Sequence, residues 1–199
     1  MRRSPFIVFI LSVSCAFAQS YRVTPVGAVV SDSNCYSFQA PEKWKIAAGN
    51  PAPLFFDFPP RTRVSSLQQL PKGTASLSVV SGRDSGEKPE SIDHWMELRN
   101  RAHSFSSVQE VQFAANTGIT RAVKVLWADK EDLEPGEPIT QTVAVFFEFQ
   151  GHPFAAYLSF YLDDRRREEY LKALTGLLES FRPLTNAQET SGGCSSSRF

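Results

Sequence analysis

The alternation of apolar and polar residues predicts that β-strands form most of the core. In residues 75–79 the odd positions are apolar and the even positions are serine, which is typical of a strand with one buried face. Residues 143–149 and 154–160 show the same period with larger side chains, and Gln150-Gly151-His152-Pro153 between them predicts a hairpin turn. We expect further strands at residues 36–40, 44–46, 54–58 and 119–127.

The same counting assigns side chains to the two faces of each strand. It places five residues on one face of the strand at residues 119–127: Ile119, Arg121, Val123, Val125 and Trp127. Phe146 falls on the face opposite Val145. Either a helix covers that face as well, or Phe146 belongs to an exposed docking patch. We expect the helix, because sheets of this kind are covered on both sides.

Apolar residues at a period of 3.6 predict two helices. The first begins after Ser91, a favourable N-cap, and continues through Trp95 to Ala102. The second is predicted over residues 163–181, with an apolar stripe from Tyr170 onward that must be buried. The three arginines at 165–167 are then expected in its first turn.

Strands joined by hairpins, with one internal and one terminal helix, predict an α+β fold on a mostly antiparallel β-sheet flanked by helices. The C-terminal amphipathic helix is expected to pack on the sheet. Residues 20–184 would form this single domain, since the length suits one domain. Residues 185–199 are rich in serine and glycine and are predicted to be a disordered tail.

Residues 1–18 have the features of a signal peptide. Arg2 and Arg3 precede a short apolar run, and Ala16-Phe17-Ala18 is a small-x-small cleavage signal. We therefore expect an exported protein, periplasmic or secreted, cleaved near Ala18. Lipid anchoring at Cys15 is the alternative, but Leu11 lies one position too far from that cysteine to resemble a lipoprotein signal. The remaining chain has no apolar stretch long enough to span a membrane.

Composition changes this picture in two respects. The chain has 21 basic and 21 acidic residues, so its balanced charge argues against a nucleic-acid partner. Once the signal peptide leaves with Cys15, Cys35 and Cys194 are the remaining cysteines. An exported protein permits them to form a disulfide, which would fasten the tail to the domain. Two unpaired thiols are the alternative.

The order of segments resembles that of PsbP-like (Mog1/PsbP/DcrB-like) domains. The resemblance lies in Phe38-Gln39-Ala40-Pro41-Glu42-Lys43-Trp44, in the strand at 75–79, in the helix at 91–101, and in the closing strand and helix that end at Pro183. It implies an α/β/α sandwich and a role as a binding or assembly factor. It implies no catalytic residues, because the family has no shared catalytic motif.

Three groups of residues were candidates for chemistry. Asp129, Glu131, Asp132 and Glu134 cluster between two predicted strands and are weak candidates for Ca²⁺ ligands; a solvated hairpin loop is the alternative. The histidines His94, His103 and His152 are too dispersed for a local metal site. Ser85-Gly86-Glu87-Lys88 matches an S-x-x-K motif, but the companion motifs are absent. We expect no cofactor and no bound metal.

These observations favour an exported, monomeric, non-catalytic binding or assembly domain with an envelope protein as partner. A small-molecule or Ca²⁺-binding envelope protein is one alternative. A small hydrolase is the other, and it requires a pocket with a histidine beside an aspartate or serine. The long polar connections at 59–70, 81–89 and 129–137 are the expected contact face, because long loops often mediate binding.

Overall fold

The computed structural model describes residues 21–46, 53–57, 73–129 and 139–184. The helices are α1 (Ile92–His103), α2 (Arg167–Glu179) and the short 3₁₀-helix η1 (Ala115–Thr117). The strands are β1 (Arg22–Val23), β2 (Ala28–Ser31), β3 (Tyr36–Gln39), β4 (Lys45–Ile46), β5 (Leu54–Asp57), β6 (Ala75–Ser81), β7 (Ser107–Val111), β8 (Ile119–Asp129), β9 (Thr140–Phe149), β10 (His152–Tyr161) and β11 (Arg182–Pro183).

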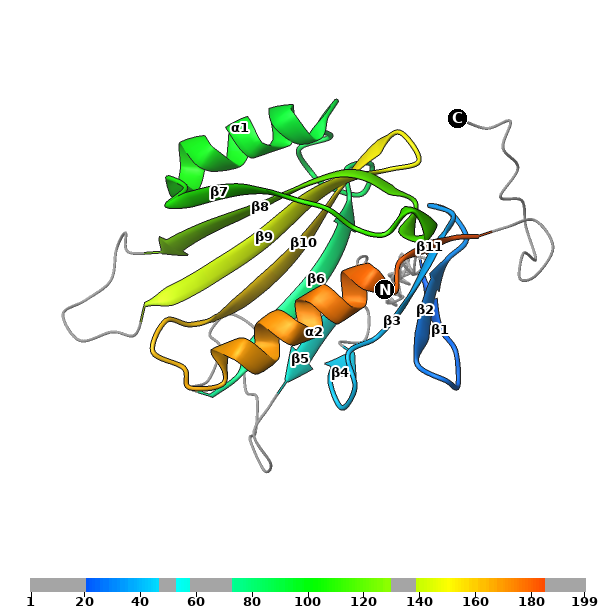
Figure 1. Cartoon of the computed structure of the whole chain (residues 1–199), viewed down its shortest axis with the longest axis horizontal. Helices are drawn as coiled ribbons and strands as arrows, with labels where there is room; N and C mark the ends of the chain where they lie inside the picture. Colours follow the sequence, from blue (N-terminus) through cyan, green and yellow to red (C-terminus); the bar gives the residue numbers. More distant parts are fainter. Residues whose placement is uncertain (1–20, 47–52, 58–72, 130–138, 185–199) are drawn as a thin grey trace, which may run out of the picture.

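The strands form two sheets, and every pair of neighbouring strands is antiparallel. The large sheet has seven strands in the order β4-β5-β6-β10-β9-β8-β7, and the small one has four in the order β1-β2-β3-β11. Figure 1 shows the small sheet beside one end of α2. The described chain is therefore a mostly antiparallel α+β fold with two helices, which confirms the α+β class that the sequence predicted.

The large sheet is covered by a helix on each face (Figure 1). One face packs against α2 and forms the larger core, in which the odd residues of β9 meet Leu174, Leu177 and Leu178. The other face packs against α1 through a smaller core that includes Trp95 and Phe146. Phe146 is fully buried there, so it is a core residue, as we expected, and does not belong to a docking patch.

The start of α1 is as predicted, whereas α2 begins later than expected. The Ser91 hydroxyl accepts a hydrogen bond from the backbone N–H of His94 at 3.1 Å and caps α1. The segment predicted to open the second helix forms turns instead, because the Asp164 carboxylate accepts a bond from the N–H of Arg166 at 2.9 Å. Arg165 and Arg166 therefore precede the helix, and the placement of all three arginines in its first turn was wrong.

A β-bulge corrects the predicted face of β8. The register shifts between Ile119 and Arg121. Ile119 consequently belongs to the core under α2, while Trp127 belongs to the core under α1. Val123 and Val125 share the α1-side core with Trp127, as predicted, so only Ile119 was assigned to the wrong face. Sequence alternation cannot detect the single extra residue of a bulge. The β9–β10 turn is also shorter than predicted: only Gln150 and Gly151 form it, both with positive φ.

Candidate functional site

Part of the α2-side face of the large sheet extends beyond the helix. In the strand order β8 and β7 follow β9 at the edge, whereas α2 packs mainly on β10 and β3. Figure 1 shows β8 and β7 running past the helix on this side. A helix is about 10 Å wide and two neighbouring strands are about 4.8 Å apart, so one helix cannot cover seven strands. A groove forms at this uncovered edge.

This groove, which we call the α2 groove, has a volume of about 500 Å³. One wall is α2, the opposite wall is the chain from Val111 through η1, and the floor is formed by β8 and β9. Its lining is mainly apolar, with polar groups from three residues of the wall opposite α2 and from Thr175. The residues that line it are Val111, Gln112, Phe113, Ala114, Asn116, Thr117, Lys124, Val145, Leu171, Leu174, Thr175, Leu178, Glu179 and Arg182.

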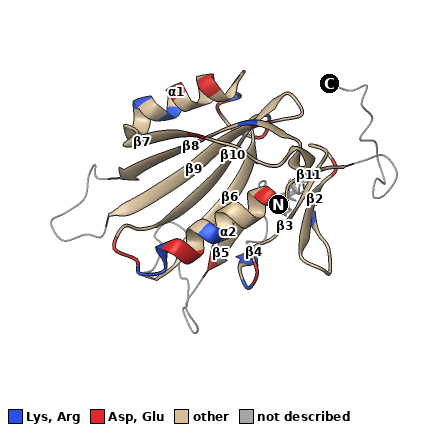
Figure 2. Ribbon diagram, viewed as in Figure 1, with Lys and Arg blue, Asp and Glu red and all other residues tan. Residues whose placement is uncertain are grey.

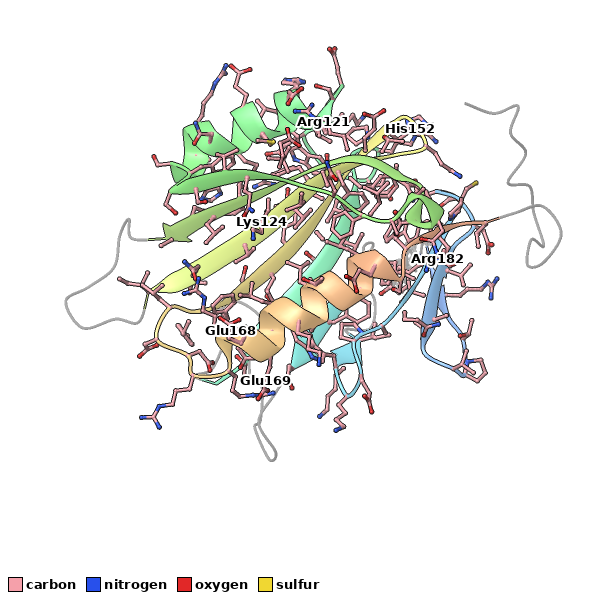
Figure 3. All side chains as sticks on the ribbon, viewed as in Figure 1. Arg121, Lys124, His152, Glu168, Glu169 and Arg182 are labelled. Atoms are coloured by element: carbon pink, nitrogen blue, oxygen red, sulfur yellow. The ribbon has the colours of Figure 1, made fainter. Side chains whose placement is uncertain are left out.

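Lys124 is the charged group on the floor of the α2 groove (Figure 3). It is half-buried and shares its sheet face with Ala122 and Leu126, which contact the core under α2. Its cross-strand neighbours, Gln109 on β7 and Val145 on β9, are uncharged. Within the described part of the chain Lys124 makes no hydrogen bond or ion pair. Its ammonium group is therefore available to a ligand in the groove.

The end of the groove near the small sheet contains Arg182 and Glu179. The guanidinium of Arg182 donates to the carbonyl oxygens of Glu179 at 2.7 Å and Phe181 at 2.6 Å. It thus satisfies carbonyl groups at the C-terminal end of α2, where a positive charge is favourable. The lining as a whole contains two cations, Lys124 and Arg182, and one carboxylate, Glu179.

A second groove lies on the other side of α2, against the turn between β3 and β4, with a volume of about 470 Å³. Its central charges already pair with one another. Arg166 forms ion pairs with Asp57 and, at 2.9 Å, with Glu169. The Tyr170 hydroxyl donates to Asp164 at 3.1 Å. Burial, together with the negative charge of Asp164, raises the pKa of Tyr170. This network is satisfied without a ligand, so we consider the α2 groove the better candidate.

Figure 2 shows that charged residues gather on α1, at both ends of α2 and near β4, whereas the strands are mostly uncharged. Those on α1 are largely in ion pairs. Arg121 pairs with Asp93 at 2.7 Å and Glu110 at 3.3 Å, which lowers the pKa of Asp93 mainly through the hydrogen bond. Lys124 differs from these exposed charges in its position, because it is half-buried on the face of the sheet.

The sequence-predicted site residues lie mostly elsewhere. Glu131, Asp132 and Glu134 are outside the described residues, as is the segment 59–70, and Asp129 is the last residue of β8. Within the described ranges, no three or more His, Cys, Asp or Glu side chains are placed to hold a metal ion together. Cys35 is buried and disulfide-bonded. Its partner lies outside the described residues, so the expected pairing with Cys194 stays a prediction.

The three histidines are dispersed, and none lines either large groove. The backbone N–H of Glu90 donates to Nδ1 of His94 at 3.4 Å. The ring of His103 stacks on Trp127 at 5.0 Å. Nε2 of His152 accepts a bond from Arg83 at 3.1 Å. Burial and then the charge of Arg83 lower the pKa of His152. The adjacent cavity, lined by His152 and Ser81 among others, has a volume of about 10 Å³, which is at the lower limit for holding one water molecule.

The loop at 81–89 is held by internal hydrogen bonds. The Ser85 hydroxyl donates to the carbonyl of Gly82 at 3.0 Å and accepts from the backbone N–H of Lys88 at 3.1 Å. Asp84 accepts a bond from the Asn34 amide at 2.9 Å. Ser85 therefore stabilises a turn, and the S-x-x-K match reflects local structure.

The α2 groove was not among the sequence candidates. One signal for it was present: Lys124 occupies a position that alternates with Val123 and Val125 and faces the same way as two apolar neighbours. A lysine on the core-facing side of a strand is unusual and could have been singled out. That this face stays open depends on the strand order, which local patterns do not determine.

Comparisons with known proteins identify no family for this chain. No family model matches it. No curated protein matches it. A solved structure from Bacteroides thetaiotaomicron VPI-5482 is similar with a TM-score of 0.43 and 12% sequence identity, over 84% of this chain and 52% of that chain. This chain thus spans about half the length of that protein. Among the described residues, no helix is both long and apolar enough to cross a membrane.

Proposed function

We propose that this chain is an exported, non-catalytic binding domain and that the α2 groove is its binding site. The observation behind the proposal is the groove itself, about 500 Å³ of mainly apolar surface with Lys124 on its floor. Small-molecule and cofactor sites typically have about 300–1,000 Å³ of largely apolar lining with a few placed polar groups. The α2 groove has both properties.

The proposed setting is the cell envelope. The signal peptide predicted for residues 1–18 supports export, and the arrangement of one helix on each sheet face supports a PsbP-like (Mog1/PsbP/DcrB-like) architecture. Domains of that kind are typically binding or assembly factors, and an envelope protein is the proposed partner of a monomeric chain. With Cys15 removed alongside the signal peptide, Cys194 is the proposed partner of the disulfide-bonded Cys35.

A small-molecule ligand is the second candidate, and the form of the groove favours it. A stable protein partner usually buries about 800 Å² on each side, which requires a broad surface. The α2 groove is instead a trough between a helix and the chain from Val111 through η1. A ligand shaped like a chain fits such a trough. The Ca²⁺-binding alternative depends instead on the acidic cluster, of which Glu131, Asp132 and Glu134 lie outside the described residues.

Filling the groove tests the proposal. Thr175 and Lys172 are both exposed on α2, but Thr175 lines the α2 groove and Lys172 lines the second groove. In the variant Thr175→Trp the indole would occupy the trough, while Lys172→Trp is the matched control. We expect tagged mature Thr175→Trp, purified under mild conditions from envelope extract, to lose whatever co-purifies with the wild type. Lys172→Trp should retain it.

The readout is mass spectrometry of both the protein and the small-molecule fractions, so either class of ligand is detected. Circular dichroism of each variant confirms that it is folded. Equal co-purification with Thr175→Trp and with the wild type would contradict the assignment of the α2 groove as the binding site.

A further inference from the structure

The position of Lys124 limits the chemistry that the α2 groove can bind. Lysine is almost never fully buried without a partner, because an ammonium group loses hydration that nothing replaces. Lys124 is half-buried, and the residues directly opposite it on the two neighbouring strands, Gln109 and Val145, are uncharged. The groove therefore offers one cationic point in an apolar trough, which is complementary to a molecule with one anionic end and a hydrocarbon body.

The apolar part of the trough is long enough for such a body. Leu171, Leu174 and Leu178 follow one another along α2 and line it, and Phe113 lines the opposite wall. The seven residue steps of helix from Leu171 to Leu178 span about 10 Å at 1.5 Å per step. That length corresponds to an extended chain of several carbon atoms.

The charges in the lining favour a single negative charge on the ligand. Arg182 already donates to two carbonyl oxygens at the end of α2. Glu179 lines the groove beside it and would repel a second anionic group. Figure 3 shows Lys124 on β8 and Arg182 next to the end of α2, so the two cations act at separate places. A monoanion that contacts Lys124 meets these conditions better than a phosphate dianion.

We infer that the α2 groove binds single-chain carboxylates, with the carboxylate on the Lys124 ammonium and the hydrocarbon chain along Leu171, Leu174 and Phe113. The inference rests on the proposed function, because it names the ligand class of the same site. The volume of about 500 Å³ lies in the lower half of the usual range for ligand pockets, which suits one chain better than a two-chain lipid.

Calorimetric titration of the purified mature protein with dodecanoate tests this inference. The wild type is expected to bind dodecanoate, and Lys124→Gln should bind it about 10- to 100-fold more weakly, which is the usual effect of losing a charged hydrogen bond. Lys124→Arg should restore binding to within a few-fold, because it returns the charge. Lys172→Gln, which removes an exposed lysine from the other side of α2, should leave the affinity unchanged.

Dodecanol provides the uncharged comparison. The wild type should bind dodecanol as weakly as Lys124→Gln binds dodecanoate, whereas the Lys124→Gln substitution should not change the affinity for dodecanol. Thermal melts establish that every variant is folded. The inference is overturned if the wild type does not bind dodecanoate, or if Lys124→Gln and the wild type bind it equally.

The two proposals fail in different ways. If dodecanoate does not bind but Thr175→Trp still abolishes co-purification of a native ligand, the site is correct and the ligand class is wrong. If Thr175→Trp leaves both dodecanoate binding and co-purification unchanged, the α2 groove is not the site, and both proposals are overturned.

Discussion

Replacing Phe181 with alanine is expected to lower the free energy of unfolding by about 3–5 kcal/mol, the usual cost of truncating a buried phenylalanine to alanine. Phe181 is fully buried directly after α2. Its ring lies 5.0 Å from those of Tyr36 and Phe149, 5.3 Å from that of Phe147, and 5.4 Å from that of Phe38. It thereby joins the C-terminal end of the helix to both sheets.

Urea unfolding followed by fluorescence and circular dichroism measures this effect. Phe105→Ala is the matched control, because Phe105 is only half-buried and its ring contacts those of Trp127 and Phe146. We expect it to cost less than half as much as Phe181→Ala. Similar losses for the two variants would contradict the central position of Phe181 in the core.

Replacing Trp95 with alanine is expected to have a comparable effect on the other face of the sheet, again about 3–5 kcal/mol. Trp95 is fully buried, and its ring packs at 5.6 Å on Phe146 and at 6.4 Å on Tyr157. Its indole N–H also donates to the Glu87 carboxylate at 2.6 Å. The substitution removes both the main contact of α1 with the sheet and this hydrogen bond.

Hydrogen exchange separates the role of Trp95 from a general loss of stability. In Trp95→Ala the amides of α1 should exchange faster than those of α2, because α1 loses its central anchor. Trp95→Phe keeps an aromatic ring but not the N–H donor, and we expect a smaller loss of stability. Equal protection of the two helices in Trp95→Ala would show that α1 does not depend on this contact.

The large sheet could be predicted from the sequence to a considerable extent, because large apolar side chains recur at every second position of its central strands. The strands β6, β9 and β10 alternate in hydrophobicity and were expected at nearly their observed positions. The edge strand β7 was missed. Its first four residues are exposed, so nothing in its sequence distinguishes a buried face.

The small sheet was largely missed for a different reason. β1 and β11 have two residues each, which is too short for any period to be recognised. β2 reads Ala-Val-Val-Ser, which is apolar without alternation. These strands are defined by their pairing with β3, and pairing between distant segments leaves no local pattern.

The candidate site could not be predicted because it depends on tertiary arrangement. The sequence predicted binding residues in long polar loops. The α2 groove is formed instead by a helix, a sheet edge and a short connection. Alternation shows that Lys124 faces the same side as Ala122 and Leu126. Only the strand order shows that α2 leaves this side open and that the neighbours of Lys124 are uncharged.

The most direct test of the central claim places a photoreactive residue, p-benzoylphenylalanine, in the α2 groove of the exported protein in its native envelope. At position 175 the probe lines this groove, and at position 172 it lines the other side of the same helix. If the α2 groove is the binding site, irradiation should give a defined adduct at position 175 and none at position 172. Equal adducts at both positions, or none at position 175, would contradict it.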